Sequence, residues 1–389
     1  MALMSGIRRI VCGISGGVDS AVAAFLLKQS GHEVHGLYMR NWDVSDEAGR
    51  CTADQDVEDA KFVCRQLQIP FHDVNFVKEY WNDVFSYLIH EYENGRTPNP
   101  DILCNKHIKF DAFLEYACSE LKSDAIATGH YARRSNMDAD GGVKLLKAED
   151  TVKDQTLFLS QISQDALRKT LFPVGGLAKS AVKAIAVDAG LKKIARKKES
   201  MGICFIGSRN FHSFIEEYLE PRPAKFIDIE DGRIVGFHKG IHYWTLGQAC
   251  HIPGQKQRYF VADKNIQTHD ILVAPGTNHP ALFTDSFMTG APHWIHKAPP
   301  DLQNLGTVTL DFRFQHKHPL IPCTISRMSA LCDSFHVTLS QPMRAITPGQ
   351  FAVFYSDEEC LGSAQIETLG PSLYSLNFKD EVLLPKVFS

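Results

Sequence analysis

The sequence predicts an α/β protein in which a doubly wound parallel sheet is followed by a small β-rich domain and a C-terminal β-barrel. Three observations support this prediction. An apolar strand runs into a glycine-rich loop and an apolar helix near the N-terminus. Strands and helices then alternate over the first third of the chain. Beyond residue 220, apolar residues alternate with polar ones in short segments, as they do in half-buried strands.

The first predicted elements lie between Ile10 and Gly31. The apolar run 10–14 leads into a Ser-Gly-Gly turn, and residues 21–27 form a second apolar run that ends before Gly31. Amides freed by the two glycines and by the helix N-terminus form a nest for an anion. No Gly-Lys-Ser/Thr follows, which excludes the Walker loop that holds a terminal phosphate. A plain tight turn is the alternative, but the flanking strand and helix favour a phosphate site.

The alternation continues with predicted strands at 33–39, 71–76 and 124–130 and predicted helices at 53–68, 77–93 and 107–121. This order is typical of a parallel sheet, whose ligands bind at the carboxyl ends of the strands. Met39, Gly129 and His130 fall at such ends, beside the glycine-rich loop. Residues 151–200 are predicted to be helical, and they include a basic cluster at 192–198.

The pattern changes after an amphipathic helix predicted over 211–219. A hairpin is expected over 226–235 with its turn at Asp231-Gly232. Alternating strands follow at 307–314 and 335–339, and a last pair of strands covers 351–355 and 361–366. These changes predict three domains, with boundaries near 210 and 285: residues 1–210, 211–285 and 286–389.

Composition narrows the class of protein. At 389 residues the chain is long enough for two or three domains. Hydrophobic residues make up 44% and charged residues 22%, as in globular proteins, and no apolar run is long enough to cross a bilayer. Because the net charge is −4, any nucleic-acid surface must be a local patch.

The cysteines and the N-terminus bear on the compartment. Ten cysteines occur without a Cys-x-x-Cys pair, which argues against a zinc ribbon and favours a reducing compartment. The first strand begins too early for a cleavable signal peptide. Residues 1–9 carry two arginines and no acid, which is at most a stub of a mitochondrial presequence.

Two cysteines are candidates for chemistry. Cys104 follows the proline-stiffened loop 96–103 and precedes the predicted helix 107–121, which Asn105 or the preceding turn would cap. A thiolate at a helix N-terminus is stabilised by the helix dipole, and Asp101, one turn earlier, could act as a general acid or base. Cys204 follows the basic cluster, whose lysines would lower the pKa of a nearby thiol. The alternative for both is an inert thiol in the core, and for Cys204 its own segment favours that alternative.

Five motifs occur together and in order. They are Ser15-Gly16-Gly17-Val18-Asp19-Ser20, Asn99-Pro100-Asp101 with Cys104-Asn105, Ala127-Thr128-Gly129-His130-Tyr131, Lys153-Asp154-Gln155, and Gly202-Ile203-Cys204-Phe205. The first resembles the PP-loop of ATP pyrophosphatases. The whole set spans most of the chain and resembles the tRNA-specific 2-thiouridylase family. Thr347-Pro348-Gly349-Gln350 and Glu359-Cys360-Leu361-Gly362 match its C-terminal barrel, and segments such as 78–85 and 106–110 resemble its mitochondrial branch.

The resemblance implies an enzyme that replaces O2 of the wobble uridine with sulfur in tRNAs for Lys, Glu and Gln. A uracil carbonyl has no competent leaving group, so ATP would adenylate the oxygen, and the loop amides with Mg²⁺ would hold the departing pyrophosphate. Cys204 would carry a persulfide, Cys104 would complete sulfur release by forming a disulfide with it, and Asp101 would move protons. The sulfur would come from a cysteine desulfurase, directly or through a relay protein, in the mitochondrial matrix.

The same resemblance assigns the binding residues. Those expected to bind ATP are Gly13, Ile14, Ser15, Gly16, Gly17, Val18, Asp19, Ser20, Met39 and Gly129. Those expected to contact tRNA are Asn99, Pro100, Asp101, His130, Lys153, Asp154, Gln155, Arg313, Phe314 and Gln350. Of these, Lys153 and Arg313 suit phosphates by their charge alone. The basic cluster 192–198 and the group of Arg313 with 316–318 are the two candidate phosphate-binding patches. No residue is assigned to a resident metal, and no membrane contact is expected.

Two other classes of function share parts of these patterns. A PP-loop synthase that adenylates a small molecule needs no cysteine pair and no tRNA-sized basic face, so Cys104 together with Cys204 argues against it. A non-catalytic RNA-binding module would not need a complete nucleotide loop. Whether the release of pyrophosphate from ATP requires tRNA distinguishes the three classes.

Overall fold

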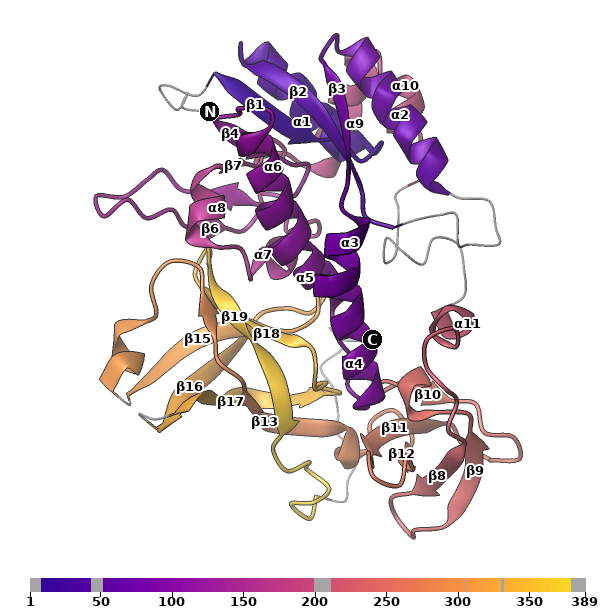
Figure 1. Cartoon of the computed structure of the whole chain (residues 1–389). Helices are drawn as coiled ribbons and strands as arrows, with labels where there is room; N and C mark the ends of the chain where they lie inside the picture. Colours follow the sequence, from indigo (N-terminus) through magenta and orange to yellow (C-terminus); the bar gives the residue numbers. More distant parts are fainter. Residues whose placement is uncertain (1–7, 43–51, 199–210, 305, 330–331, 379–389) are drawn as a thin grey trace.

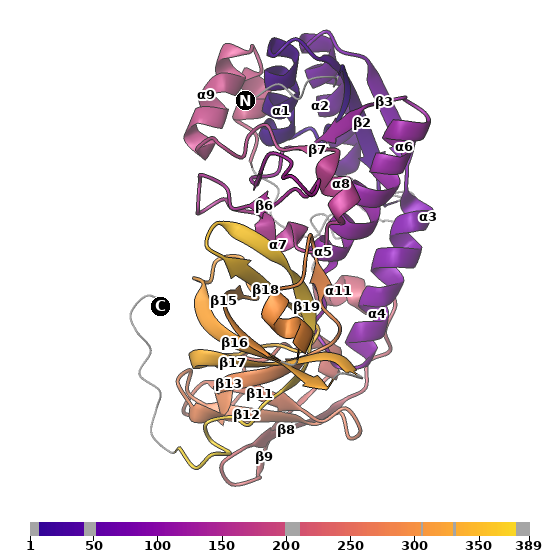
Figure 2. The same ribbon diagram turned by 90° about the vertical axis from the view of Figure 1, so that its left-hand side faces the viewer.

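The computed structural model describes residues 8–42, 52–198, 211–304, 306–329 and 332–378. These residues form the three expected kinds of unit. An α/β unit lies at the top of Figure 1, a closed β-barrel lies below it on one side, and a small β-sheet unit lies below it on the other side. One long helical rod descends from the α/β unit alongside both β units (Figures 1 and 2).

The α/β unit contains the predicted parallel sheet, in the order β3-β2-β1-β4-β7 with every neighbouring pair parallel. Its strands are β1 (Arg9–Gly13), β2 (Glu33–Arg40), β3 (Phe71–Asn75), β4 (Ala125–Ala127) and β7 (Thr170–Leu171). Along β1, Ile10 and Cys12 enter one hydrophobic cluster and Val11 enters another. Because side chains alternate along a strand, both faces of the sheet are covered, and the doubly wound prediction is confirmed.

The two faces carry different helices. One face packs against α1 (Val18–Gln29), α2 (Thr52–Gln66), α9 (Lys179–Asp188) and α10 (Lys192–Ala195). The other packs against two composite helices. The first runs through α3 (Val77–Tyr80), the π-helical η1 (Trp81–Phe85) and α4 (Ser86–Glu93). The second runs through α5 (Pro100–Leu103), the π-helical η2 (Cys104–Ala112) and α6 (Phe113–Ser119).

The remaining elements of this unit connect it to the others. They are β5 (Arg133–Arg134), β6 (Leu145–Leu146), α7 (Thr156–Leu159), α8 (Gln164–Arg168) and α11 (Phe211–Ile215). The predicted amphipathic helix is shorter than expected, but Phe214, Ile215 and Leu219 are buried in the cluster under the composite helices. No helix in the described ranges has the length and apolar character needed to span a bilayer.

The small unit is a sheet in the order β10-β11-β12-β8-β9. Its elements are β8 (Ala224–Asp228), β9 (Ile234–His238), the 3-10 turn η3 (Ile241–Tyr243), β10 (Ala249–Cys250), β11 (Tyr259–Lys264) and β12 (Ile271–Pro275). The predicted hairpin is confirmed, because β8 and β9 pair antiparallel around Gly232 at φ 74°. Glycine adopts this left-handed conformation without the steric cost of a Cβ.

The C-terminal unit closes into a barrel because β13 pairs with both β17 and β19. Its elements are η4 (Pro280–Leu282), β13 (Phe283–Thr289), β14 (His293–Trp294), η5 (Pro300–Asn304), β15 (Thr307–Arg313), β16 (Ile321–Ser329), β17 (Cys332–Arg344), β18 (Phe351–Ser356) and β19 (Glu359–Leu369). The predicted boundary at 285 falls inside β13. Sequence analysis did not predict that β6 of the α/β unit would extend this sheet by pairing with β19.

The barrel packs directly on the α/β unit. Along β18, Ala352 and Phe354 enter the barrel core, whereas Phe351, Val353 and Tyr355 enter the cluster beneath α5 and η2. The α/β unit and the barrel therefore share one hydrophobic interface, and this interface lies under the segment that carries Asp101 and Cys104.

Candidate active site

The glycine-rich loop has the geometry of an anion nest. Gly16 has φ 72°, and a Cβ there would lie 2.6 Å from the backbone oxygen of Asp56, so only glycine fits. The Ser20 hydroxyl accepts a hydrogen bond from the Ser15 amide (3.2 Å) and donates one to the Gly17 carbonyl (3.1 Å). Gly17 caps α1 without a side-chain hydrogen bond, so the first amides of this helix are left for a ligand.

Two lysines from distant segments lie beside this loop. Lys179, the first residue of α9, forms an ion pair with Asp19 at 2.7 Å, and the Tyr131 hydroxyl donates to the same carboxylate at 2.9 Å. Lys197 pairs with Asp56 and Asp59, both at 2.7 Å, and also donates to the Gly16 carbonyl at 3.3 Å. Sequence analysis missed Lys179 and grouped Lys197 with a tRNA-binding patch. In the structure both ammonium groups lie next to the phosphate nest, and each is paired with at least one carboxylate.

Met39 and Gly129, the two residues predicted to bind ATP that lie outside the segment 13–20, are both close to the glycine-rich loop. The end of the Met39 side chain is 3.3 Å from where a Cβ on Gly13 would be. A Cβ on Gly129 would lie 2.5 Å from the Ser20 amide nitrogen, so the missing side chain lets the segment after β4 approach the start of α1 closely. The contact of Met39 and Gly129 with a nucleotide stays a prediction.

The second candidate centre is the start of α5, for which sequence analysis left two caps open, Asn105 or the preceding turn. The helix begins at Pro100 and its cap is Asn99, whose side-chain oxygen accepts from the Ile102 amide at 3.4 Å. Asn105 does not cap it, and instead donates to the Phe158 carbonyl at 2.9 Å. Cys104 therefore lies one turn inside the composite helix, and Asp101 occupies its first turn. Proline at the first helical position, preceded by asparagine, was the sequence signal for this start.

The surroundings of Asp101 suit proton transfer. Burial raises the pKa of its carboxyl group, and the charge of Lys109 opposes that rise. Burial lowers the pKa of His130 well below its ordinary value, and the positive charge of Lys109 lowers it further. Sequence analysis did not single out Lys109. The His130 ring stays neutral near pH 7 and lies 2.8 Å from the Thr128 hydroxyl. Asp101 and His130 thus share one positively charged neighbour, and a carboxyl with a raised pKa can both give and take a proton.

One of the two candidate cysteines, Cys104, lies among the described residues. Cys104 is 4% exposed and belongs to the core cluster beneath α5 and η2. Cys204, with the rest of residues 199–210, lies outside the described residues. The disulfide between Cys104 and Cys204 therefore stays a prediction.

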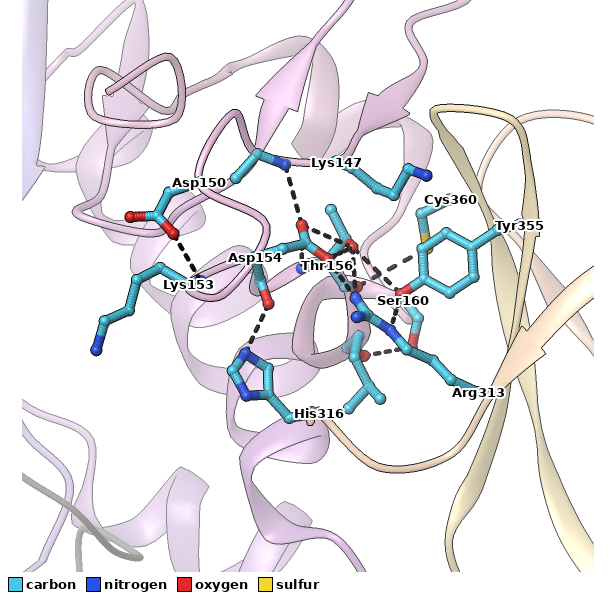
Figure 3. A network of polar contacts seen from close by, with 12 residues as sticks. Lys147, Asp150, Lys153, Asp154, Thr156, Ser160, Arg313, His316, Tyr355 and Cys360 are labelled. Carbon is cyan, nitrogen blue, oxygen red and sulfur yellow. Dashed lines mark hydrogen bonds and ion pairs between the residues drawn. The ribbon is translucent and has the colours of Figure 1, made fainter. Parts of the chain in front are cut away.

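The residues of the motif 153–155 have different surroundings. The backbone amide of Lys153 bonds to Asp150, and its ammonium points away from the polar network in Figure 3. Gln155 bonds in both directions with the backbone of Tyr131, at 2.8 and 2.9 Å, next to His130. Asp154 is 2% exposed and turns toward the barrel.

Asp154 and Arg313 are paired with each other (Figure 3). The Arg313 guanidinium also donates to Tyr355 at 3.1 Å and to Thr156 at 3.3 Å, while Thr156 donates to Asp154 at 2.8 Å. Arg313 is 7% exposed, and the neighbouring Phe314 is 1% exposed in the barrel core. These side chains join the α/β unit to the barrel, so the tRNA contact that the resemblance implies for them stays a prediction.

Among the described residues no cluster of three acidic, histidine or cysteine side chains could hold a metal ion. A nucleotide-borne Mg²⁺ needs only one or two carboxylates besides the phosphates. Asp19 is such a carboxylate at the mouth of the nest, and it is already shared by Lys179 and Tyr131. The donor set fits a magnesium ion that arrives with a nucleotide.

Comparison with known proteins gives matches along most of the chain. A profile described as "tRNA methyl transferase HUP domain" matches residues 8–208. Profiles described as "tRNA methyl transferase PRC-barrel domain" and "Aminomethyltransferase beta-barrel domain" match residues 212–275 and 284–366. The three matches follow the α/β unit, the small sheet unit and the barrel in order.

Full-length relatives are named for a different reaction from these profiles. Mitochondrial tRNA-specific 2-thiouridylase 1 of Gallus gallus is 51% identical over 399 residues, which cover 95% of this chain and 94% of the relative. The protein of the same name in Homo sapiens is 51% identical over 395 residues, which cover 96% and 93%. The tRNA-specific 2-thiouridylase MnmA of Escherichia coli is 44% identical over 366 residues, which cover 92% and 97%.

Proposed function

Because the chain belongs to the tRNA-specific 2-thiouridylase family, we propose that it adenylates O2 of the wobble uridine and replaces this oxygen with sulfur. It is an enzyme, a tRNA-uridine 2-sulfurtransferase. One arrangement in the molecule supports the proposal. The phosphate nest with Lys179 follows β1, and the composite helix that carries Asp101 and Cys104 packs against one face of the same sheet.

The first step uses ATP. The nest of residues 15–20 binds the phosphates, and the ammonium groups of Lys179 and Lys197 balance the charge of the departing pyrophosphate. Mg²⁺ held by Asp19 and the phosphates would supply further neutralisation of that charge. The uridine oxygen attacks the α-phosphorus, pyrophosphate leaves, and O2 becomes part of AMP, a good leaving group. Met39 and Gly129 border the space for the adenosine.

The second step uses the two cysteines. The terminal sulfur of a persulfide on Cys204 attacks C2, and AMP departs with the oxygen and its bonding electrons. The Cys104 thiolate then attacks the Cys204 sulfur, which leaves sulfur on C2 and forms a Cys104–Cys204 disulfide. A thiol reductant restores both cysteines. Asp101 transfers the protons, as its raised pKa allows.

The wobble base reaches this site from a single-stranded loop. Extruding an unpaired base costs little, and Asn99, Pro100, Asp101 and His130 would line its pocket, with Lys153 on phosphate. We propose tRNAs for Lys, Glu and Gln as substrates and a cysteine desulfurase as the source of sulfur, directly or through a relay protein. The names of the relatives place them in mitochondria, and we propose the mitochondrial matrix for this chain.

The test combines the purified full-length chain, ATP, a persulfide donor and unmodified tRNA for Lys. We expect AMP, pyrophosphate and 2-thiouridine, all dependent on tRNA, with the nucleoside measured by mass spectrometry. Lys179→Met and Asp19→Ala should abolish AMP formation. Cys104→Ser and Cys204→Ser should stop thiolation without stopping tRNA binding, whereas Cys118→Ser serves as the matched control. ADP and phosphate as products, or near-normal thiolation by Cys204→Ser, would contradict the proposal.

A further inference from the structure

The loop that precedes the candidate catalytic residues is held by both β units. We define loop 95–99 as the residues from Gly95 to Asn99, between α4 and α5. It leads directly into Pro100 and Asp101, and its last residue caps the helix that carries Cys104. Loops of this kind are ordinarily the more mobile parts of a domain, so partners that hold one in place affect the groups next to it.

The barrel holds the loop through the turn between Thr347 and Gln350. The Gln350 carboxamide nitrogen donates to the carbonyl oxygens of Thr97 (2.7 Å) and Pro98 (3.3 Å), and its oxygen accepts from the Asn99 side chain at 3.4 Å. The Thr97 amide in turn donates to the Pro348 carbonyl at 3.0 Å. Gln350 thus satisfies two backbone carbonyls of the loop and contacts the residue that caps α5.

The small sheet unit holds the same loop from another side. The Lys264 ammonium, at the end of β11, donates to the Gly95 carbonyl at 2.8 Å. The Thr245 and Thr97 hydroxyls lie 3.3 Å apart. A Cβ on Gly95 would be 3.5 Å from both Ile241 and Ile266, so the small unit also packs against the start of the loop. Burial lowers the pKa of the half-buried Lys264 to about 7, and the charge of Asp263 opposes this shift.

We propose that Gln350 and Lys264 are positioning residues, which hold loop 95–99 so that Asn99 and Asp101 keep the geometry that sulfur transfer needs. Through them the two β units control the catalytic segment without touching the reacting atoms. The inference rests on the proposed function for the roles of Asp101 and Cys104. A displacement of only about 1 Å at a reacting group can cost a large part of the rate, which is why such a link matters.

The test compares Gln350→Ala and Lys264→Met with matched controls in the full-length chain. Gln164→Ala removes another carboxamide that joins the α/β unit to the barrel, through the carbonyls of Val143 (2.9 Å) and Ile295 (3.0 Å). Lys297→Met removes another lysine that links units, through its ion pair with Asp140 at 2.6 Å. Neither control residue contacts loop 95–99 in the described structure.

The first readout is amide hydrogen exchange of residues 97–105 without substrates. We expect faster exchange in Gln350→Ala and Lys264→Met and wild-type exchange in both controls. The second readout compares turnover with tRNA binding. The kcat for thiolation should fall about tenfold or more in both test variants, while their Kd for tRNA should change little. Unchanged exchange in both test variants overturns the proposal. A weakened Kd with unchanged kcat does so too, because it would make Gln350 a simple tRNA contact.

A third variant adds a pH signature. The carboxylate in Gln350→Glu cannot donate to Thr97 or Pro98, and it repels their carbonyl oxygens, so exchange should be fast at neutral pH. Protonation at lower pH restores one donor, and exchange in the loop should slow relative to Gln350→Ala. A merely space-filling role for Gln350 predicts no such pH dependence and would contradict the proposal. Because exchange needs neither ATP nor tRNA, failure of the proposed enzymatic function would leave this part of the test intact.

Discussion

Three lysines from distant segments reach oxygen atoms of the two loops that form the candidate site. Lys179 and Lys197 lie beside the phosphate nest, and Lys264 bonds to the Gly95 carbonyl. The first two have carboxylate partners, whereas the hydrogen bond from Lys264 ends on a neutral carbonyl. Burial without a paired carboxylate disfavours the charged form of an amine. Burial therefore opposes the charge of Lys264.

This opposition predicts a pH dependence of stability. The pKa of Lys264 is about 7 in the folded chain and near its ordinary value of 10.5 when unfolded. Between these values the unfolded chain binds more protons, so this group makes stability rise as pH increases from 7 toward 10.5, and its cost is greatest below pH 7. The slope is at most about 1.4 kcal/mol per pH unit, and solvent screening of the half-buried side chain reduces it.

The measurement is the melting temperature of wild type, Lys264→Met and Lys297→Met from pH 6.5 to about 10, the range that the shifted pKa defines. The difference between wild type and Lys264→Met should change in favour of wild type as pH rises. Lys297 is exposed in its ion pair, so its replacement should give a nearly constant offset. Parallel curves for wild type and Lys264→Met would contradict the prediction.

Single residues also show where sequence-based prediction stopped. The motif 15–20 could be recognised because its glycines and hydroxyls interact within one short segment, so their spacing is visible in the sequence. The ion pairs of Lys179 with Asp19 and of Lys197 with Asp59 span 160 and 138 residues, and no local pattern encodes them. Sequence analysis therefore grouped Lys197 with a tRNA-binding patch and could not predict its ion pairs beside the nucleotide loop; its contact with tRNA stays a prediction.

At the scale of elements, the turn at Gly349 sets how closely the barrel approaches loop 95–99. Gly349 has φ 94°, and a Cβ there would lie 3.0 Å from the backbone nitrogen, carbon and oxygen of Thr97. Gly254 has a similar φ of 78°, but nothing lies within 4 Å of its Cβ position. The two glycines share the backbone conformation and differ in the contact.

Gly349→Ala should therefore be more damaging than Gly254→Ala. Both variants incur strain from the left-handed conformation, about 1–2 kcal/mol. Only Gly349→Ala also pushes against the Thr97 backbone, so its melting temperature should be the lower of the two. It should also accelerate hydrogen exchange in residues 97–105. Equal melting temperatures for the two variants would contradict this prediction, because they would show that the close approach of the turn to the loop does not affect stability.

Elements with strong local patterns were predictable, and those defined by distant pairing were not. The parallel strands, the hairpin at Gly232 and the alternating strands β15 and β17 follow from periodicity and turn residues. β6 is two residues long and is defined by its pairings with β5 and with the distant β19. The start of α5 at Asn99-Pro100 was available as a signal, but sequence analysis left the cap open between Asn105 and the preceding turn.

At the scale of the whole molecule, the α/β unit and the barrel are joined by a buried charge network. Asp154, Thr156, Tyr355 and Arg313 connect the two units across their shared apolar interface (Figure 3). Burial of the guanidinium is offset by Tyr355 and Asp154, which together raise the pKa of Arg313. Removing one member of such a pair leaves the other charge buried and without compensation.

Arg313→Met should accordingly destabilise the chain by about 3–5 kcal/mol, because the Asp154 carboxylate loses its counter-charge. Combining it with Asp154→Asn removes that charge while keeping an oxygen for the Ala148 amide, so the double variant should recover part of the loss. Thermal unfolding and a double-mutant comparison measure both effects. A single variant as stable as wild type would contradict the structural role.

The same variants separate this role from phosphate binding. Removing a cation that binds a tRNA phosphate lowers the slope of log affinity against log salt by about 0.7–0.9 units, uniformly across tRNAs. Because the Arg313 guanidinium is 7% exposed and committed to Asp154, the double variant, once folded, should keep the wild-type slope. Lys153→Met removes the lysine that the family resemblance places on a tRNA phosphate, so this variant should reduce the slope instead. A reduced slope in the double variant would mean that Arg313 leaves Asp154 for a phosphate when tRNA binds, and that the interface between the α/β unit and the barrel rearranges in the complex.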